Sequence, residues 1–136
     1  MRMTKLMWIG VFSAMTVLGC STTHEIFGAR GVAPGAEGEV VTSKDDYGNT
    51  EMKLKLKHLA PPDRINTGAN AYVVWIQGVG QPQFQNVGGL NVNRDLTAEY
   101  STRVPYENFR LIVTPEPSAT VSSPSGVPVF DQYIKR

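Results

Sequence analysis

The sequence contains a single cysteine, Cys20, so the chain cannot form an internal disulfide. It has only two histidines, His24 and His58, and neither stands at a ligand spacing typical of zinc sites. No nucleophile elbow is present, and a Ser-His-Asp arrangement can be drawn only by choosing its members freely. The sequence therefore predicts no metal ligands, no catalytic residues and no enzymatic activity.

An excess of charge of one sign is also missing, since 13 basic residues face 12 acidic ones. Binding to a nucleic acid needs a clustered basic excess, so we expect no nucleic-acid partner. The segments DDYGN at residues 45–49 and NVNRD at residues 91–95 have oxygen ligands, but they lack the alternating ligand pattern of a Ca²⁺ loop. Both are interpreted as ordinary turns, in which Asp, Asn and Gly are the usual residues.

The sequence has no apolar run long enough to cross a bilayer comfortably. Residues 6–18, LMWIGVFSAMTVL, carry no charge, but a transmembrane helix needs ~20 residues. The basic residues Arg2 and Lys5 precede this run, and the small residue Gly19 follows it. A basic start, a short apolar run and a small residue before a cleavage point are the parts of an export signal. The sequence therefore predicts an exported protein.

The residues VLGC, at positions 17–20, resemble the lipobox of bacterial lipoproteins, although Val17 stands where Leu is usual. The resemblance implies removal of residues 1–19 as a signal peptide, attachment of diacylglycerol to the Cys20 sulfur and acylation of its new amino group. Burial of acyl chains in the bilayer gives ~0.8 kcal/mol per methylene, so two or three chains anchor a protein in the membrane permanently. In this family Ser21, rather than Asp, is compatible with transport to the outer membrane. The alternative is a buried thiol or a different cleavage point.

Residues 20–38 have Gly, Ala and Pro but no sustained period, which is typical of a flexible tether. Docking of Ile26 and Phe27 on the domain is the alternative. Residues 39–136 form the predicted folded domain, and no segment in them shows an apolar stripe at helical spacing. We therefore expect one lipidated, tethered domain that has no cofactor apart from its covalent lipid.

Two segments of this domain predict strands of different kinds. Residues 50–58, TEMKLKLKH, alternate apolar and polar side chains, as a half-buried strand does. Residues 71–77, AYVVWIQ, are continuously apolar until the end, as in a strand covered on both faces, with Trp75 expected at the centre of the core. Further strands are expected at residues 39–43, 84–92, 96–102, 108–114 and 126–130, with loops at 60–70 and 115–126. Some seven short strands predict an all-β, immunoglobulin-like antiparallel β-sandwich.

The domain also resembles the extracytoplasmic C-terminal domain of anti-sigma-K factors over about residues 40–130. That domain has a YxLW strand and a VTxEP strand end, and the matching residues are Tyr72, Trp75, Val113, Thr114, Glu116 and Pro117. SPSG, at residues 123–126, departs from the Pro-Thr-Gly form of the family. The resemblance implies the β-sandwich fold, but the zinc-binding regulatory domain of the family has no counterpart here, and fold alone does not imply function.

Lys53, Lys55 and Lys57 alternate along one expected strand and would line a face over ~13 Å. Such a stripe fits phosphate-bearing headgroups or an acidic partner. The alternative is a solvated face that discourages edge-to-edge pairing. Together these patterns predict a non-enzymatic, lipid-anchored envelope protein whose sandwich binds or supports another envelope component. An extracytoplasmic sensory or regulatory module related to anti-sigma-factor domains is the alternative.

Overall fold

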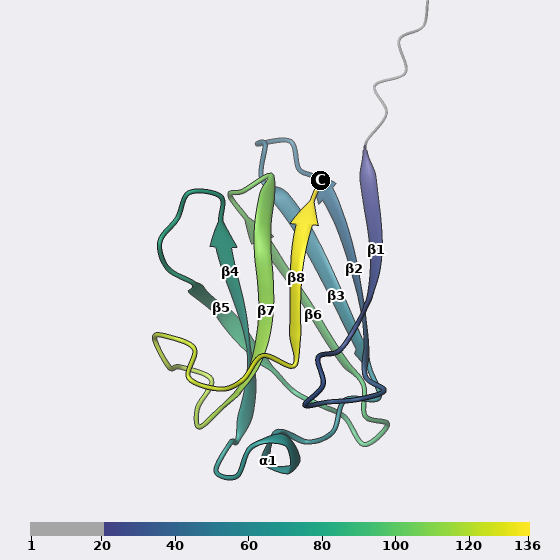
Figure 1. Cartoon of the computed structure of the whole chain (residues 1–136). Coiled ribbons are helices and arrows are strands. Elements are labelled where there is room, and N and C mark those ends of the chain that lie inside the picture. Colours follow the sequence, from purple (N-terminus) through teal and green to yellow (C-terminus); the bar gives the residue numbers. More distant parts are fainter. Residues whose placement is uncertain (1–20) are drawn as a thin grey trace, which may run out of the picture.

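The computed structural model describes residues 21–136, which form a nearly all-β domain of two antiparallel sheets (Figure 1). The elements are β1 Thr22–Gly28, β2 Glu37–Lys44, β3 Thr50–Lys57, α1 Pro62–Ile65, β4 Ala71–Gly78, β5 Gln85–Leu90, β6 Ala98–Val104, β7 Asn108–Glu116 and β8 Phe130–Lys135. The first sheet has the order β1-β2-β3-β6, and the second has the order β5-β4-β7-β8. The all-β prediction is therefore confirmed.

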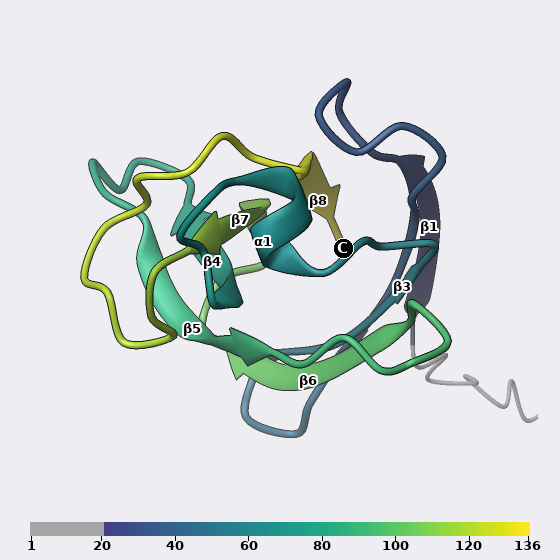
Figure 2. The same cartoon turned by 90° about the horizontal axis from the view of Figure 1, so that it is seen from below.

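The chain crosses between the sheets three times. β1, β2 and β3 form a meander in the first sheet, and the connection that contains α1 leads into the β4–β5 pair of the second sheet. β6 then returns to pair with β3, and β7 and β8 complete the second sheet beside β4. Viewed along the strands, the two sheets enclose a common interior, with α1 at one end (Figure 2).

β3 confirms the predicted half-buried strand. Its apolar residues Met52, Leu54 and Leu56 are buried, while the lysines between them are exposed. Because successive side chains of a strand point to opposite faces, the apolar set lines the interior. It packs there against inward-facing residues of the second sheet, among them Tyr72, Val74, Ile76, Phe109, Leu111, Phe130 and Ile134.

β4 is buried on both faces, as its continuous apolar sequence predicts. The expected position of Trp75 is wrong, however. Tyr72, Val74 and Ile76 face the main core, so Trp75 points to the opposite side of the sheet, where it forms a separate cluster with Val73 and Ile112. Trp75 is fully buried in this second cluster, not at the centre of the sandwich. The period of two along β4 is the physical reason.

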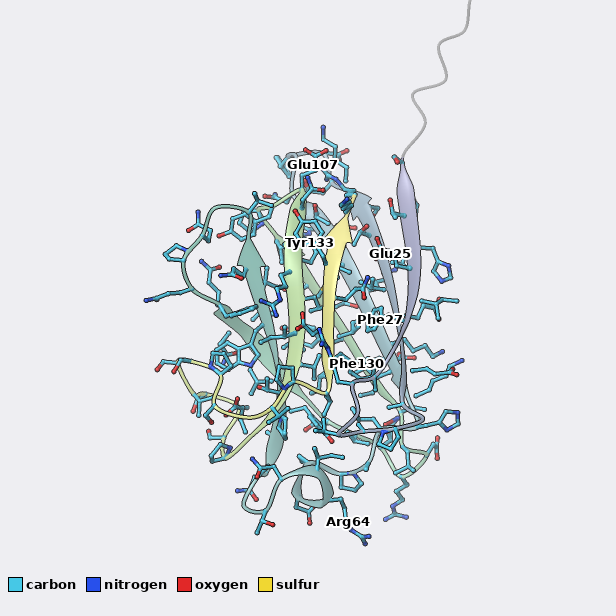
Figure 3. The ribbon with its side chains drawn as sticks, in the orientation of Figure 1. Glu25, Phe27, Arg64, Glu107, Phe130 and Tyr133 are labelled. Carbon is cyan, nitrogen blue, oxygen red and sulfur yellow. The ribbon has the colours of Figure 1, made fainter. Side chains whose placement is uncertain are left out.

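The segment expected to be a tether contains a strand, which corrects that part of the prediction. β1 pairs with β2 from Thr22 to Gly28. Phe27 is 9% exposed and meets Phe130 edge to face, with ring centroids 5.5 Å apart, whereas Ile26 is 73% exposed (Figure 3). Of the two residues that could dock on the domain, Phe27 does so. Its apolar area holds β1 against the second sheet.

Two further boundaries differ from the sequence-based expectations. The last strand lies at Phe130–Lys135 and not at residues 126–130, because the segment makes its first backbone hydrogen bond to β7 only at Val129, whose N–H donates to Val113 O at 2.8 Å. β6 begins at Ala98, since Leu96 has a positive φ of 61° and forms part of the turn before it. Together with β1, residues 21–136 contain eight strands instead of about seven.

Candidate functional site

The three lysines of β3 lie on the outer face of the first sheet, with acidic residues beside them. Lys55 is paired with Glu39 of β2 and Glu99 of β6, and its Nζ lies 3.7 Å from Glu99 Oε1. Lys57 lies opposite Glu37 in the register of β2 and β3. Cross-strand partners share a face of the sheet, so these carboxylates offset the ammonium charges.

The same face is nearly neutral as a whole. Its acidic and basic side chains are Glu37, Glu39, Glu51, Glu99, Lys53, Lys55, Lys57 and Arg103. Arg103 Nη2 lies 2.9 Å from Glu51 Oε1. The geometry therefore favours the solvated face over a cationic docking stripe, because Lys55 and Lys57 have carboxylates as cross-strand partners and only Lys53, between Val41 and Ser101, does not.

His24 belongs to this face as well, although its segment was expected to be a tether. Its Nε2 lies 2.5 Å from Glu39 Oε1, on the neighbouring strand. The hydrogen bond from His24 lowers the pKa of Glu39 below its ordinary value. His58 lies in the turn after β3, where its φ is 56°. The two histidines thus have different surroundings.

Glu116, at the end of β7, is a buried carboxylate that accepts four hydrogen bonds. Its Oε1 accepts hydrogen bonds from Thr114 Oγ1 (2.6 Å), Ser125 N (2.8 Å) and Gly126 N (3.1 Å), and its Oε2 accepts one from Ser125 Oγ (2.5 Å). Trp75 Nε1 donates to Thr114 Oγ1 at 2.8 Å. The sequence singles out Thr114 and Glu116 only through the anti-sigma-K resemblance, which gives them no role.

Burial raises the pKa of Glu116, but the hydrogen bonds from Ser125, Thr114 and Gly126 outweigh it and bring the pKa below its ordinary value. Neutral donors thus stabilise the anion without a basic partner. The carboxylate ties the loop of residues 117–129 to β7, and Val121 of this loop packs on the Trp75 cluster. Because Glu116 is completely buried, its role is to fix this loop and not to meet a ligand.

Asp131 forms a second polar centre, at the start of β8. Arg110 Nε and Nη2 donate to its two carboxylate oxygens at 2.8 and 2.7 Å, and Arg30 Nη2 donates to Oδ2 at 2.8 Å. The hydrogen bonds from Arg110 lower the pKa of Asp131 and raise that of the arginine. Since Arg30 comes from the β1–β2 loop, the pair joins that loop to the second sheet.

A shallow apolar groove lies next to Asp131, between the β1–β2 loop and the segment before β8. Its lining residues are Arg30, Gly31, Val32, Val127, Pro128 and Asp131. Val127 is 62% exposed and Val32 is 40% exposed, so two aliphatic side chains stand beside a charged pair. We call this the distal groove, because it lies at the end of the sandwich away from Thr22. Apolar centres with polar rims are typical of protein contact surfaces.

Among residues 21–136, no group of three or more His, Cys, Asp or Glu side chains is placed to hold a metal ion. No helix in the same range is long and apolar enough to span a membrane. Cys20 and the predicted signal lie outside the described residues. Comparisons with protein-family models, curated proteins and solved structures found no match.

Proposed function

We propose that the chain is a non-enzymatic bacterial lipoprotein of the cell envelope, held in the outer membrane by a diacylglycerol and an acyl chain on Cys20. The observation that carries this proposal is the lipobox-like VLGC at residues 17–20, after a basic start and a short apolar run. The domain that follows begins at Thr22, only two residues later. That arrangement suits a domain held at a membrane surface.

The strand order supports an immunoglobulin-like sandwich as the finer description of the fold. In such sandwiches strands B and E are neighbours in one sheet, while C′, C, F and G are neighbours in the other. Here β3 and β6 are neighbours as strands B and E are, and the order β5-β4-β7-β8 matches the order C′, C, F and G. β1 and β2 extend the first sheet on the other side of β3. Sandwiches of this type serve binding in many unrelated proteins, so the fold is compatible with a binding role.

The distal groove is the surface that best supports binding of another envelope protein. Val32 and Val127 are exposed there, beside the Arg30–Asp131 ion pair. The two aliphatic side chains provide apolar area that a partner can bury. The ion pair at the rim provides polar contacts that can orient the partner. The lysine face of the first sheet is less suitable, because its charges are balanced within the sheet.

Anchoring is tested by replacing Cys20 with Ala in the full chain, or by inhibiting signal peptidase II, and then fractionating cells. The proposal predicts that the wild-type protein sediments with outer membranes, whereas the variant accumulates unprocessed or leaves the outer-membrane fraction. A Cys20→Ala protein with wild-type processing and fractionation would contradict the anchoring.

The binding role is tested by cross-linking in intact cells. Val127→Glu places a charge in the distal groove, and Ile26→Glu is the matched control, since it puts the same charge at an exposed aliphatic position outside the groove. We expect a cross-linked species that wild type and the Ile26 variant form and that the Val127 variant loses. A pattern identical in all three proteins, or no cross-linked species, would count against the groove. A Lys53/Lys55/Lys57 triple Glu variant tests the lysine face in the same way.

A sensory or regulatory module is the second candidate. The observation that favours it is that residues matching the anti-sigma-K motifs, namely Trp75, Thr114 and Glu116, belong to one hydrogen-bonded chain. This candidate predicts a transcriptional response when the gene is deleted. An unchanged transcriptome would discard it.

A further inference from the structure

The two ends of the sandwich differ in their distance from Cys20. β1 starts at Thr22, and the same end holds the β2–β3 turn, the β6–β7 turn with Glu107, and the C-terminus (Figures 1 and 3). The opposite end holds α1, with Arg64, and the distal groove (Figure 3). We call the end at Thr22 the proximal end.

The register of the first sheet shows how far the proximal end extends. Thr22 is paired with Ser43, and Ser43 is paired with Glu51, so these three residues lie in one row. The β2–β3 turn continues beyond this row, with Tyr47 near its tip. Cys20 is two residues from Thr22, and two residues span at most ~7 Å. A lipid on Cys20 would therefore bring the bilayer surface to within reach of the turn.

Tyr47 is 87% exposed on a turn that is firmly held. Asp45 Oδ1 accepts hydrogen bonds from the backbone N–H of Tyr47 (2.9 Å) and of Asn49 (2.8 Å), and Oδ2 accepts one from Asn49 Nδ2 (3.0 Å). Arg136 Nη1 donates to the Asn49 carbonyl oxygen at 3.1 Å. The backbone that carries Tyr47 is thus held in place, so the turn itself loses little conformational entropy when the ring meets a surface.

The chemistry of the proximal end suits a lipid surface without net charge. Tyr is enriched where membrane and water meet, because its ring is apolar and its hydroxyl is polar. Val79, in the β4–β5 connection at the same end, is 65% exposed. The charged residues at this end balance, and they are Lys44, Asp45, Asp46, Glu51, Arg103, Glu107, Lys135 and Arg136. A balanced surface is neither attracted to nor repelled from zwitterionic headgroups over long range.

We propose that the proximal end docks on the membrane surface, with the Tyr47 side chain in the headgroup region of zwitterionic phospholipids. This inference rests on the proposed lipid anchor. It sets the sandwich upright on the bilayer, so that the distal groove points away from the lipid, toward partners. The outer face of the first sheet, which carries the lysines, is then perpendicular to the membrane plane and does not lie on the headgroups.

The test uses the full-length gene, so that the cell processes the protein, followed by reconstitution into phosphatidylcholine vesicles. A nitroxide spin label is placed at Asp46→Cys, which leaves Tyr47 in place, and in a matched protein at Val127→Cys in the distal groove. Since the chain has one cysteine, acylation of Cys20 leaves the introduced thiol as the single labelling site. We expect collisions with a water-soluble nickel chelate to be several-fold rarer at position 46 than at position 127.

Replacing Tyr47 with Ser in the Asp46→Cys protein should raise the chelate accessibility of the label toward that of position 127. Equal accessibility of positions 46 and 127, or no change on removing Tyr47, would overturn the docking. The intact mass of the same samples separates the two proposals. An acylated protein with equal accessibilities overturns the docking alone, whereas a protein without the lipid overturns the docking and the anchor together.

Discussion

The outer faces of the two sheets differ in what covers them. The first sheet exposes alternating charged residues to solvent, and its inner face alone is apolar. In the second sheet, β4 and residues 111–116 of β7 are buried on both faces, because the loop of residues 117–129 covers Trp75 and its neighbours. A face that meets water is specified by alternation within a single strand, whereas a face under a loop also needs contacts that hold the loop in place.

Glu116 provides such contacts in the second sheet. It joins β7 to Ser125 and Gly126 of the covering loop, and Thr114 links the carboxylate to Trp75. The first sheet has no need of a comparable group on its outer face, since charged side chains are solvated there. The comparison predicts that substitutions on the outer face of the second sheet lower the free energy of unfolding strongly. Substitutions at equivalent places of the first sheet should change it little.

Trp75→Ala should have the largest effect. It removes a fully buried indole between the second sheet and its loop, so we expect the free energy of unfolding to fall by about 3–5 kcal/mol. Lys53→Ala, at an outward position of a central strand in the first sheet, should change it by less than about 0.5 kcal/mol. Urea unfolding followed by circular dichroism measures both. Similar losses in the two variants would contradict the comparison.

Glu116→Ala should come next. It leaves the buried hydroxyl of Thr114 and the part-buried donors of Ser125 without their acceptor, and hydrogen bonds to charged groups contribute about 1.5–3 kcal/mol each. Because the donors can relax toward water, we expect a total loss of about 3 kcal/mol and faster proteolysis within the loop. Glu99→Ala, an exposed carboxylate on the first sheet, is the control. A Glu116 variant as stable as that control would show that the loop is held by other contacts.

Gly126→Ala tests the close approach of the loop to β7. A Cβ at Gly126 would lie 2.2 Å from the carbonyl oxygen of Pro115, so the backbone must shift, at a cost of about 1–3 kcal/mol. Gly31→Ala meets no atom within 4 Å and serves as the matched control in another loop. Thermal unfolding of both proteins would measure the difference. Equal melting temperatures would mean that the loop can shift away from β7 without a measurable loss of stability.

Acidification should weaken the second sheet. The pKa of Glu116 is lower in the folded protein than its ordinary value of 4.5, so the unfolded chain binds the proton more tightly. The stability from this group is therefore present above pH 4.5 and is lost as the pH falls through the folded-state pKa. In Glu116→Gln we expect a shallower loss of stability below pH 4.5, measured by urea unfolding at several pH values. If the unfolding free energy of Glu116→Gln fell with pH as steeply as that of the wild type, Glu116 would not be the group responsible.

Lys55→Gln should have the smallest effect. Its partner Glu99 is exposed, and exposed ion pairs contribute about 0–1 kcal/mol. We expect a change in unfolding free energy of less than about 0.5 kcal/mol. Unchanged association with membranes, measured by vesicle flotation, would agree with a solvated face. A marked loss of flotation would restore the lysine stripe as a lipid contact.

The sequence predicted those features that a single strand encodes. The alternation in β3 and the apolar run of β4 led to correct strands, because burial on one or both faces leaves its own pattern. β1 was missed since Phe27 is its one deeply buried side chain, and a single apolar residue has no period. Trp75 was assigned to the wrong cluster because a continuous apolar run does not say which of its two covered faces meets the other sheet.

The candidate surfaces were harder to predict for the same reason. The lysines of β3 form a stripe in the sequence, but Glu39 and Glu99 come from strands distant along the chain and offset their charge. The distal groove joins residues near 30 with residues near 127, which only the packing of β1 against β8 brings together. Long-range contacts of this kind leave no local signal.

Intact-mass and N-terminal peptide mass spectrometry of the protein purified from envelopes test the central claim most directly. The account predicts a mature chain that begins at Cys20, with a diacylglycerol on the sulfur and an acyl chain on the amino group. A mature N-terminus at another residue, or an unmodified Cys20, would contradict it.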